Sequence, residues 1–270
     1  MRKLLVAIAL AAASFATATP AFAQSETAVE IDSRGQKIRA LLLKPENPVA
    51  SVILLAGGHG KLDIGADGAL GWGRGNQLVR TRAGYAQAGF VTLVPDIARD
   101  FKTASGVVDY YRMSLPHAQD LGAMVTYLRA LKAPVVIVGT SRGAVSAANA
   151  VAKLTGAARP DAMVLTSALL MTIKPKVPSV QAAAGNAKRL ALPALVVSHK
   201  KDTCQLTLPS SVAPFSAWYE GGGGKLAVVM LDGPEGTGPA CEAHSAHGFA
   251  GIDNQVVATV GNWIKTLPAR

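Results

Sequence analysis

The chain has 270 residues, of which 50% are hydrophobic, and carries 27 lysines and arginines against 17 aspartates and glutamates, for a net charge of +10. This composition suits one domain with a large core, and the charge favours weak contact with anionic surfaces. Aromatic residues make up only 5% and the basic residues are scattered, which argues against a nucleic-acid partner, because such partners are bound by clustered basic residues interleaved with aromatics.

The N-terminal segment has the order of a secretory signal peptide. Two basic residues precede an apolar stretch, residues 4–13, and small residues lead up to Ala23. We therefore expect that residues 1–23 are removed and that residues 24–270 form a single domain in the periplasm or outside the cell. The apolar stretch is shorter than the roughly 20 residues of a membrane-spanning helix, so we expect no membrane insertion.

Short runs of leucine and β-branched residues recur along the chain, and longer amphipathic or alanine-rich stretches separate them. This rhythm is typical of an α/β fold. We predict eight strands, near residues 27–31, 37–43, 51–55, 90–94, 135–138, 163–165, 194–197 and 226–230. Helices are predicted at about 76–88, 115–132, 142–156, 208–219 and 252–266. The first two strands should pair as an antiparallel hairpin, because turn-forming residues join them.

The segment 171–190 is the one place for an insertion between the sixth and seventh predicted strands. Since it is short, we expect at most a small flap over any site and an open entrance.

The sequence Gly139-Thr140-Ser141-Arg142-Gly143 lies between the fifth predicted strand and an alanine-rich helix. In a Gly-x-Ser-x-Gly turn of this kind the chain reverses sharply and the serine backbone is strained, so both flanking positions need to be free of side-chain bulk. The serine hydroxyl is then exposed above the sheet at a helix N-terminus, where negative charge is favoured. This pattern makes Ser141 the candidate nucleophile.

A serine nucleophile needs a base, and the base needs a third group to orient it. Asp202 follows the strand at 194–197, and His244 and His247 lie in the loop after the last strand. Asp96 and Asp232 also follow predicted strands, but the order serine, acid, histidine favours Asp202.

These residues resemble those of the α/β-hydrolase superfamily, in particular its small, nearly capless secreted esterases and dienelactone hydrolases. The resemblance implies an eight-stranded, mostly parallel sheet with helices on both faces, and a small-molecule ester substrate. It also implies that Ser141 attacks the ester, that Asp202 orients the histidine, and that an acyl-enzyme forms without a cofactor. We favour His247 as the base over His244, because His247-Gly248-Phe249 is similar to a pattern at this loop in the family.

The resemblance further implies an oxyanion hole made of two backbone N–H groups. One should belong to Arg142, directly after the nucleophile. The other should come from the loop after the third strand, and Gly58 and His59 both remain candidates there.

Two cysteines, Cys204 and Cys241, lie close in sequence to the acid and to the histidine. In an exported chain a disulfide is the default, and it would join the two loops. Cys204, Cys241, His244 and His247 are also a possible set of metal ligands, because the last three have ligand-like spacing. We favour the disulfide, because a metal site leaves the serine turn unexplained. We expect His117, at a predicted helix start, to lie on the surface.

Two further functions remain open. A serine peptidase or amidase shares the same residues but usually has a cap or added domain. A non-catalytic binding protein on a hydrolase scaffold usually lacks one of the three residues.

Overall fold

The computed structural model describes residues 25–103, 106–108 and 110–268, and the predicted signal peptide at residues 1–23 lies outside this part. Eight of its strands form one sheet: β1 (Glu26–Ser33), β2 (Gln36–Leu43), β3 (Ala50–Leu55), β4 (Phe90–Pro95), β7 (Val135–Thr140), β8 (Ala162–Thr166), β9 (Pro193–His199) and β10 (Lys225–Leu231). All eight predicted strands are therefore confirmed. A separate two-stranded ribbon, β5 (Lys102–Thr103) with β6 (Gly106–Val107), was not predicted.

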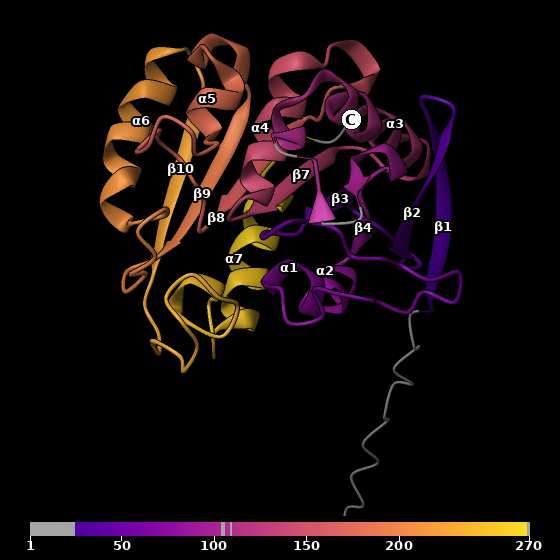
Figure 1. Cartoon of the computed structure of the whole chain (residues 1–270), viewed down its shortest axis with the longest axis horizontal. Helices are drawn as coiled ribbons and strands as arrows, with labels where there is room; N and C mark the ends of the chain where they lie inside the picture. Colours follow the sequence, from indigo (N-terminus) through magenta and orange to yellow (C-terminus); the bar gives the residue numbers. More distant parts are fainter. Residues whose placement is uncertain (1–24, 104–105, 109, 269–270) are drawn as a thin grey trace, which may run out of the picture.

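The strand order across the sheet is β1-β2-β4-β3-β7-β8-β9-β10, as Figure 1 shows from the indigo edge to the orange edge. Strand β2 is antiparallel to both of its neighbours, whereas the other pairs are parallel. The sheet is thus mostly parallel, and the opening hairpin is present as predicted.

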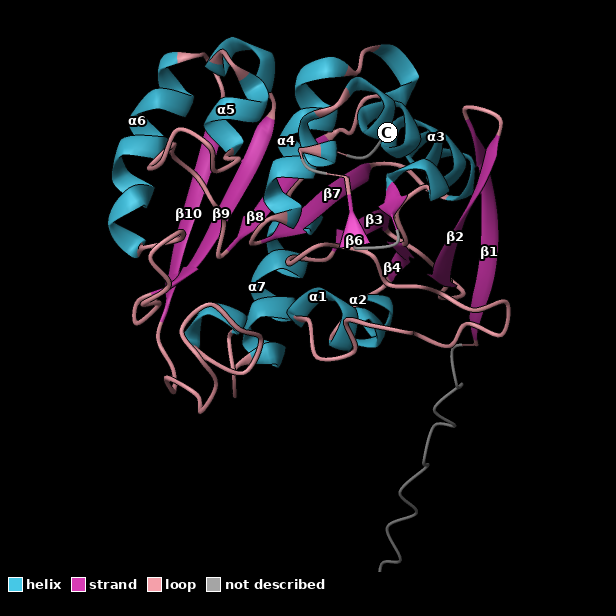
Figure 2. Ribbon diagram, in the orientation of Figure 1, coloured by secondary structure: helices cyan, strands magenta, loops and turns pink. Residues whose placement is uncertain are grey.

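Helices cover both faces of the sheet (Figure 2). They are α1 (Gln77–Arg80), α2 (Arg82–Gln87), α3 (Leu115–Leu131), α4 (Gly143–Lys153), α5 (Val180–Ala184), α6 (Val212–Gly221) and α7 (Asp253–Lys265). Short 3-10 turns lie at Arg99–Phe101, Tyr111–Met113, Gly156–Ala158, Ala187–Leu190, Pro209–Ser211 and Ala246–Gly248. Helices α3 to α6 pack in one core layer, and α1, α2 and α7 pack in the other.

The central strands are buried at every position because both of their faces are covered. Strands β3, β4, β7 and β8 expose no residue to solvent. This explains why the sequence shows continuous apolar runs there instead of the alternation of a half-exposed strand.

The predicted helix at 76–88 is two short helices, α1 and α2, that meet at Thr81. The segment 171–190 contains a loop, the short helix α5 and a 3-10 turn, and its α5 packs against α4 in the core. Tyr110 Oη donates a hydrogen bond to the carbonyl of Lys176 at 2.9 Å, which fastens the loop of this segment. Among the described residues, no helix is long and apolar enough to cross a membrane.

We expect Leu54→Ala to lower the free energy of unfolding by about 2–5 kcal/mol, because the Leu54 side chain is fully buried in the core layer beneath α1 and α7. Urea denaturation with the disulfide intact measures this loss. Leu208→Ala is the matched control, since Leu208 is 41% exposed, and it should change the free energy by less than about 0.5 kcal/mol. Equal losses in both variants would contradict the assignment of Leu54 to the core.

Candidate active site

Ser141 lies in the tight turn between β7 and α4, and the predicted turn is present. Its φ is +51°, a left-handed conformation that is uncommon for residues other than glycine. A Cβ at Gly139 would lie 2.5 Å from the carbonyl oxygen of Gly143, and a Cβ at Gly143 would clash with the carbonyl oxygen of Leu55. Both flanking positions therefore have to be glycine for the turn to close.

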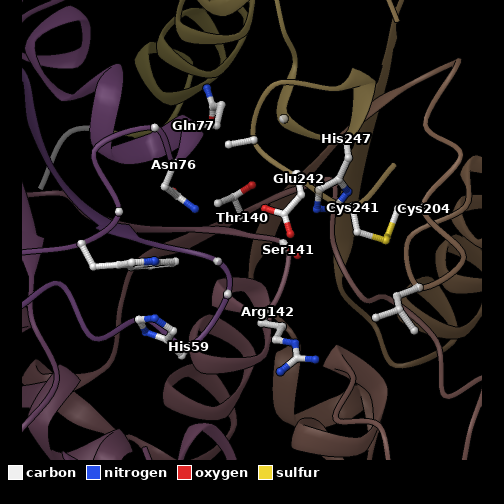
Figure 3. Close-up of a pocket in the computed structure, with 18 residues that line it drawn as sticks. His59, Asn76, Gln77, Thr140, Ser141, Arg142, Cys204, Cys241, Glu242 and His247 are labelled. Atoms are coloured by element: carbon white, nitrogen blue, oxygen red, sulfur yellow. A yellow bond between two sulfur atoms is a disulfide. The ribbon is translucent and has the colours of Figure 1, made fainter. Parts of the chain in front are cut away.

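The serine faces a cavity of about 500 Å³ at the carboxyl ends of the strands (Figure 3). Its walls come from segments far apart in sequence: the loop after β3, residues 72–77, the serine turn, and the loops after β9 and β10. The predicted residues Ser141, Arg142, Gly58, His59 and His247 all line it.

The structure brings His247 to Asp202. The His247 Nδ1 atom lies 3.1 Å from Asp202 Oδ2, and both residues are buried, at 5% and 3% exposure. His244 is exposed on the outer part of the same loop, with its Nε2 beside Gly75, and in the described part of the chain no hydrogen bond joins it to Asp202. Of the two candidate histidines, only His247 is therefore placed to be oriented by this acid.

The other two acids are engaged elsewhere. Asp96 accepts hydrogen bonds from the backbone of Leu62 and Ile64 and forms a 2.8 Å ion pair with Lys102, so it anchors the loop at 61–64. Asp232 is exposed and lies 3.7 Å from the ammonium group of Lys200. Within the described ranges, no hydrogen bond joins either carboxylate to a histidine.

Thr207 completes the surroundings of the acid, and sequence reasoning missed it. Its Oγ1 donates to Asp202 Oδ2 at 2.9 Å and lies 3.0 Å from His247 Nδ1. The other carboxylate oxygen of Asp202 accepts from the backbone N–H of Cys204 at 2.9 Å. A threonine five residues after the acid carries no motif, so only the folded loop reveals this contact.

The predicted disulfide between Cys204 and Cys241 is present, and it joins the acid loop to the histidine loop beside His247 (Figure 3). Both sulfurs of the alternative metal set are used in this bond. In residues 25–103, 106–108 and 110–268, no group of three or more histidine, cysteine or acidic side chains is arranged to hold a metal ion.

Residues of the loop after β3 line the cavity together with Ser141 and carry candidate backbone donors. In the described part of the chain, the N–H groups of Gly57, Gly58, His59 and Arg142 have no hydrogen-bond acceptor. The ring of His59 stacks on that of Trp72, with 3.9 Å between the ring centroids. Burial, with the nearby cations Lys61 and Arg112, lowers the pKa of His59, which favours a neutral ring at this position. Both candidates for the second donor line the cavity, and the geometry leaves both open.

Further polar residues line the cavity and carried no signal in the sequence, among them Asn76 and Glu242. Asn76 begins α1, but its side chain does not cap that helix and instead extends its amide toward the serine turn (Figure 3). Glu242, next to Cys241, extends its carboxylate into the cavity. Both groups are placed to contact a bound molecule.

Solved structures share this architecture. The dienelactone hydrolase from Anabaena variabilis aligns with a TM-score of 0.58 at 16% identity, covering 92% of this chain and 99% of that one. An esterase from Pyrococcus furiosus aligns at 0.61 with 15% identity, covering 90% and 91%. A carboxyl esterase from Bacillus coagulans aligns at 0.56 with 15% identity, covering 90% and 99%. The chain has the α/β-hydrolase fold.

In this fold the serine turn follows β7, Asp202 follows β9 and His247 follows β10. No protein-family model matches the chain. A search of curated proteins finds no match either.

We expect Cys204→Ser to lower the free energy of unfolding by up to about 4 kcal/mol, since the bond closes a loop of 37 residues. It should also slow the labelling of Ser141 by a fluorophosphonate probe, because the acid and histidine loops are no longer joined. Cys241→Ser and reduced wild type are the controls and should behave alike. Unchanged unfolding and labelling in all three would contradict this role of the disulfide.

We expect Thr207→Val, which preserves side-chain volume, to slow probe labelling about tenfold, because a buried carboxylate loses one hydrogen bond. Thr207→Ser retains the hydroxyl group and should remain near wild type. Equal rates for the valine and serine variants would show that the hydroxyl contact is dispensable.

Proposed function

We propose that this protein is a serine hydrolase that cleaves carboxylic esters through an acyl-enzyme. The observation that supports this most directly is the 3.1 Å contact that buried Asp202 makes with His247, which lines the cavity that Ser141 faces. Ser141 is the nucleophile, His247 the base and Asp202 the acid that orients it.

The reaction follows from these positions. With its Nδ1 proton donated to Asp202, His247 has Nε2 free to remove the proton of the Ser141 hydroxyl as its oxygen attacks the ester carbonyl. The negative oxygen that forms accepts hydrogen bonds from the N–H of Arg142 and from Gly58 or His59. The imidazolium then protonates the departing alcohol, and the same histidine activates the water that releases the acid.

Esters are favoured over peptides because the chain has little to hold a peptide. The segment 171–190, between β8 and β9, forms a loop and short helical turns and adds no cap domain. Structurally similar proteins include two described as esterases, although they are only 15% identical to this chain.

We also propose that the protein acts after export, as a periplasmic or extracellular enzyme. Disulfides persist in oxidising compartments and are rare in the reducing cytosol, and the bond between Cys204 and Cys241 joins two loops of the proposed site.

A panel of p-nitrophenyl esters of rising acyl length tests the proposal. Wild type should hydrolyse them, and Ser141→Ala and His247→Ala should lower kcat at least about 10³-fold. His244→Ala is the matched control and should stay near wild type, because that ring does not contact Asp202. p-Nitroanilides of the same acyl groups distinguish esterase from amidase activity.

Labelling with a fluorophosphonate probe separates an enzyme from a binding protein. Labelling that disappears in Ser141→Ala is expected. Folded wild type that is neither labelled nor active on any ester would contradict the proposal.

A further inference from the structure

Two consecutive residues, Tyr111 and Arg112, donate hydrogen bonds to the backbone of the loop after β3. Four successive backbone carbonyls accept hydrogen bonds from them: the Arg112 Nη2 atom lies 3.0 Å from Ala56 O, 3.5 Å from Gly57 O and 3.2 Å from Gly58 O, and the Tyr111 hydroxyl lies 2.9 Å from His59 O. Every peptide plane from residue 56 to residue 59 is therefore fastened on its carbonyl side.

Because a trans peptide is planar, its N–H points away from its C=O. Fastening the carbonyls on the Arg112 side turns the N–H groups of Gly57, Gly58 and His59 to the opposite side. Those residues line the cavity of Ser141, and their N–H groups have no acceptor in the described part of the chain. Both candidates for the second oxyanion donor are thus oriented by one guanidinium group.

The sequence leaves room for this arrangement at Gly60. This residue has a φ of +76°, which favours glycine, and a Cβ here would clash with Arg112 Nη2 and lie 2.6 Å from the Tyr111 hydroxyl. The glycine after His59 is therefore explained by the guanidinium group that packs under the loop.

The charge of Arg112 has no anionic partner. The residue is 7% exposed, and among the described residues no carboxylate pairs with it. Its remaining hydrogen bond, from Nη1, goes to Ser146 Oγ at 2.8 Å, which in turn lies 2.9 Å from His117 Nε2.

His117 does not supply a counter-charge, and its predicted surface position is wrong. The residue is only 6% exposed, because it packs with Ser146 beneath the loop. Burial, reinforced by the nearby Arg112, lowers the pKa of His117 to about 3, so the ring is neutral. Burial also lowers the pKa of Arg112, yet a guanidinium group stays charged in proteins.

We propose that Arg112 is a positioning residue of the oxyanion hole, which it serves in two ways. It fixes the peptide planes of residues 56–59 with their N–H groups toward Ser141, and its uncompensated charge makes those groups stronger donors to the oxyanion. The inference rests on the proposed ester hydrolysis. Arg112 itself acts through the loop and does not touch the substrate.

The test compares two variants. Arg112→Met removes the charge and the hydrogen bonds to the loop carbonyls, whereas Arg112→Lys retains the charge but loses the planar set of guanidinium N–H donors. Ser146→Ala is the matched control, because it removes one contact of Arg112 and leaves the carbonyl tethers in place. With p-nitrophenyl butyrate we expect Arg112→Met to lower kcat about 10–100-fold with KM changed less than about threefold, since the loss falls on the transition state. The lysine variant should lie between it and wild type.

A boronic acid that forms a tetrahedral anion on Ser141 should bind Arg112→Met more weakly than wild type. The rise in its Kd should equal the fall in kcat as a fold-change. Ser146→Ala should match wild type in both measurements. An unchanged kcat in folded Arg112→Met, or a rise in KM alone, would overturn the inference. If the methionine variant does not fold, an unchanged kcat in Arg112→Lys overturns it equally.

Amide order parameters from NMR separate failure of this inference from failure of the proposed function. In Arg112→Met the order parameters of the amides of residues 57–59 should fall from about 0.85 to below about 0.6. In Ser146→Ala the order parameters of the same amides should stay near the wild-type values. If wild type hydrolyses no ester, the proposed function fails. Unchanged order parameters in Arg112→Met would contradict the role of Arg112 in holding the loop, whatever the outcome of the ester assay.

Discussion

The site depends on one close approach between backbones. At the serine turn, α4 begins so near the end of β3 that a Cβ on Gly143 would clash with the carbonyl oxygen of Leu55. No side chain can separate the two segments, so Ser141 and the loop that follows β3 are held against each other. A Cβ on Gly57 would lie only 3.0 Å from the Cβ of Ser141. This contact therefore brings the candidate nucleophile Ser141 close to the loop that carries the candidate backbone donors.

The acid and the histidine depend on a different constraint. Asp202 and His247 lie on loops beyond the ends of β9 and β10, and loops of this kind are mobile unless they are tied down. The disulfide joins these two loops, and Thr207 and the backbone of Cys204 fix the carboxylate. Asp202 is thus held by two buried hydrogen bonds next to the disulfide, and its contact with His247 orients the ring.

The strands of the sheet could be predicted from the sequence alone, because the buried parallel strands are continuous runs of β-branched residues and leucine. The sequence was also enough for the turn around Ser141, whose two glycines are required by the backbone. It missed α5, which is only five residues long, and it placed His117 on the surface. The second error has a physical reason: the partners that bury this ring come from α4 and from the turn before α3, and no local pattern indicates that they meet. Thr207 and Arg112 were missed for the same reason.

The arginines show why the position of Arg112 is unusual in electrostatic terms. Arg34 pairs with Asp120 at 2.7 Å, and Arg129 pairs with Asp161 at 2.7 Å, so their charges are balanced in the resting protein. Arg112 is more deeply buried than either, yet among the described residues its hydrogen bonds go to carbonyl oxygens and one hydroxyl group, and its guanidinium group lies over the ring of Tyr111. A buried charge without a counter-ion is costly, and the cost falls when an anion forms nearby. In the proposed mechanism the oxyanion on the substrate is such an anion, and it exists only during the reaction. Under that proposal, part of the stabilisation of the transition state is already present in the folded protein, as the unpaired charge of Arg112.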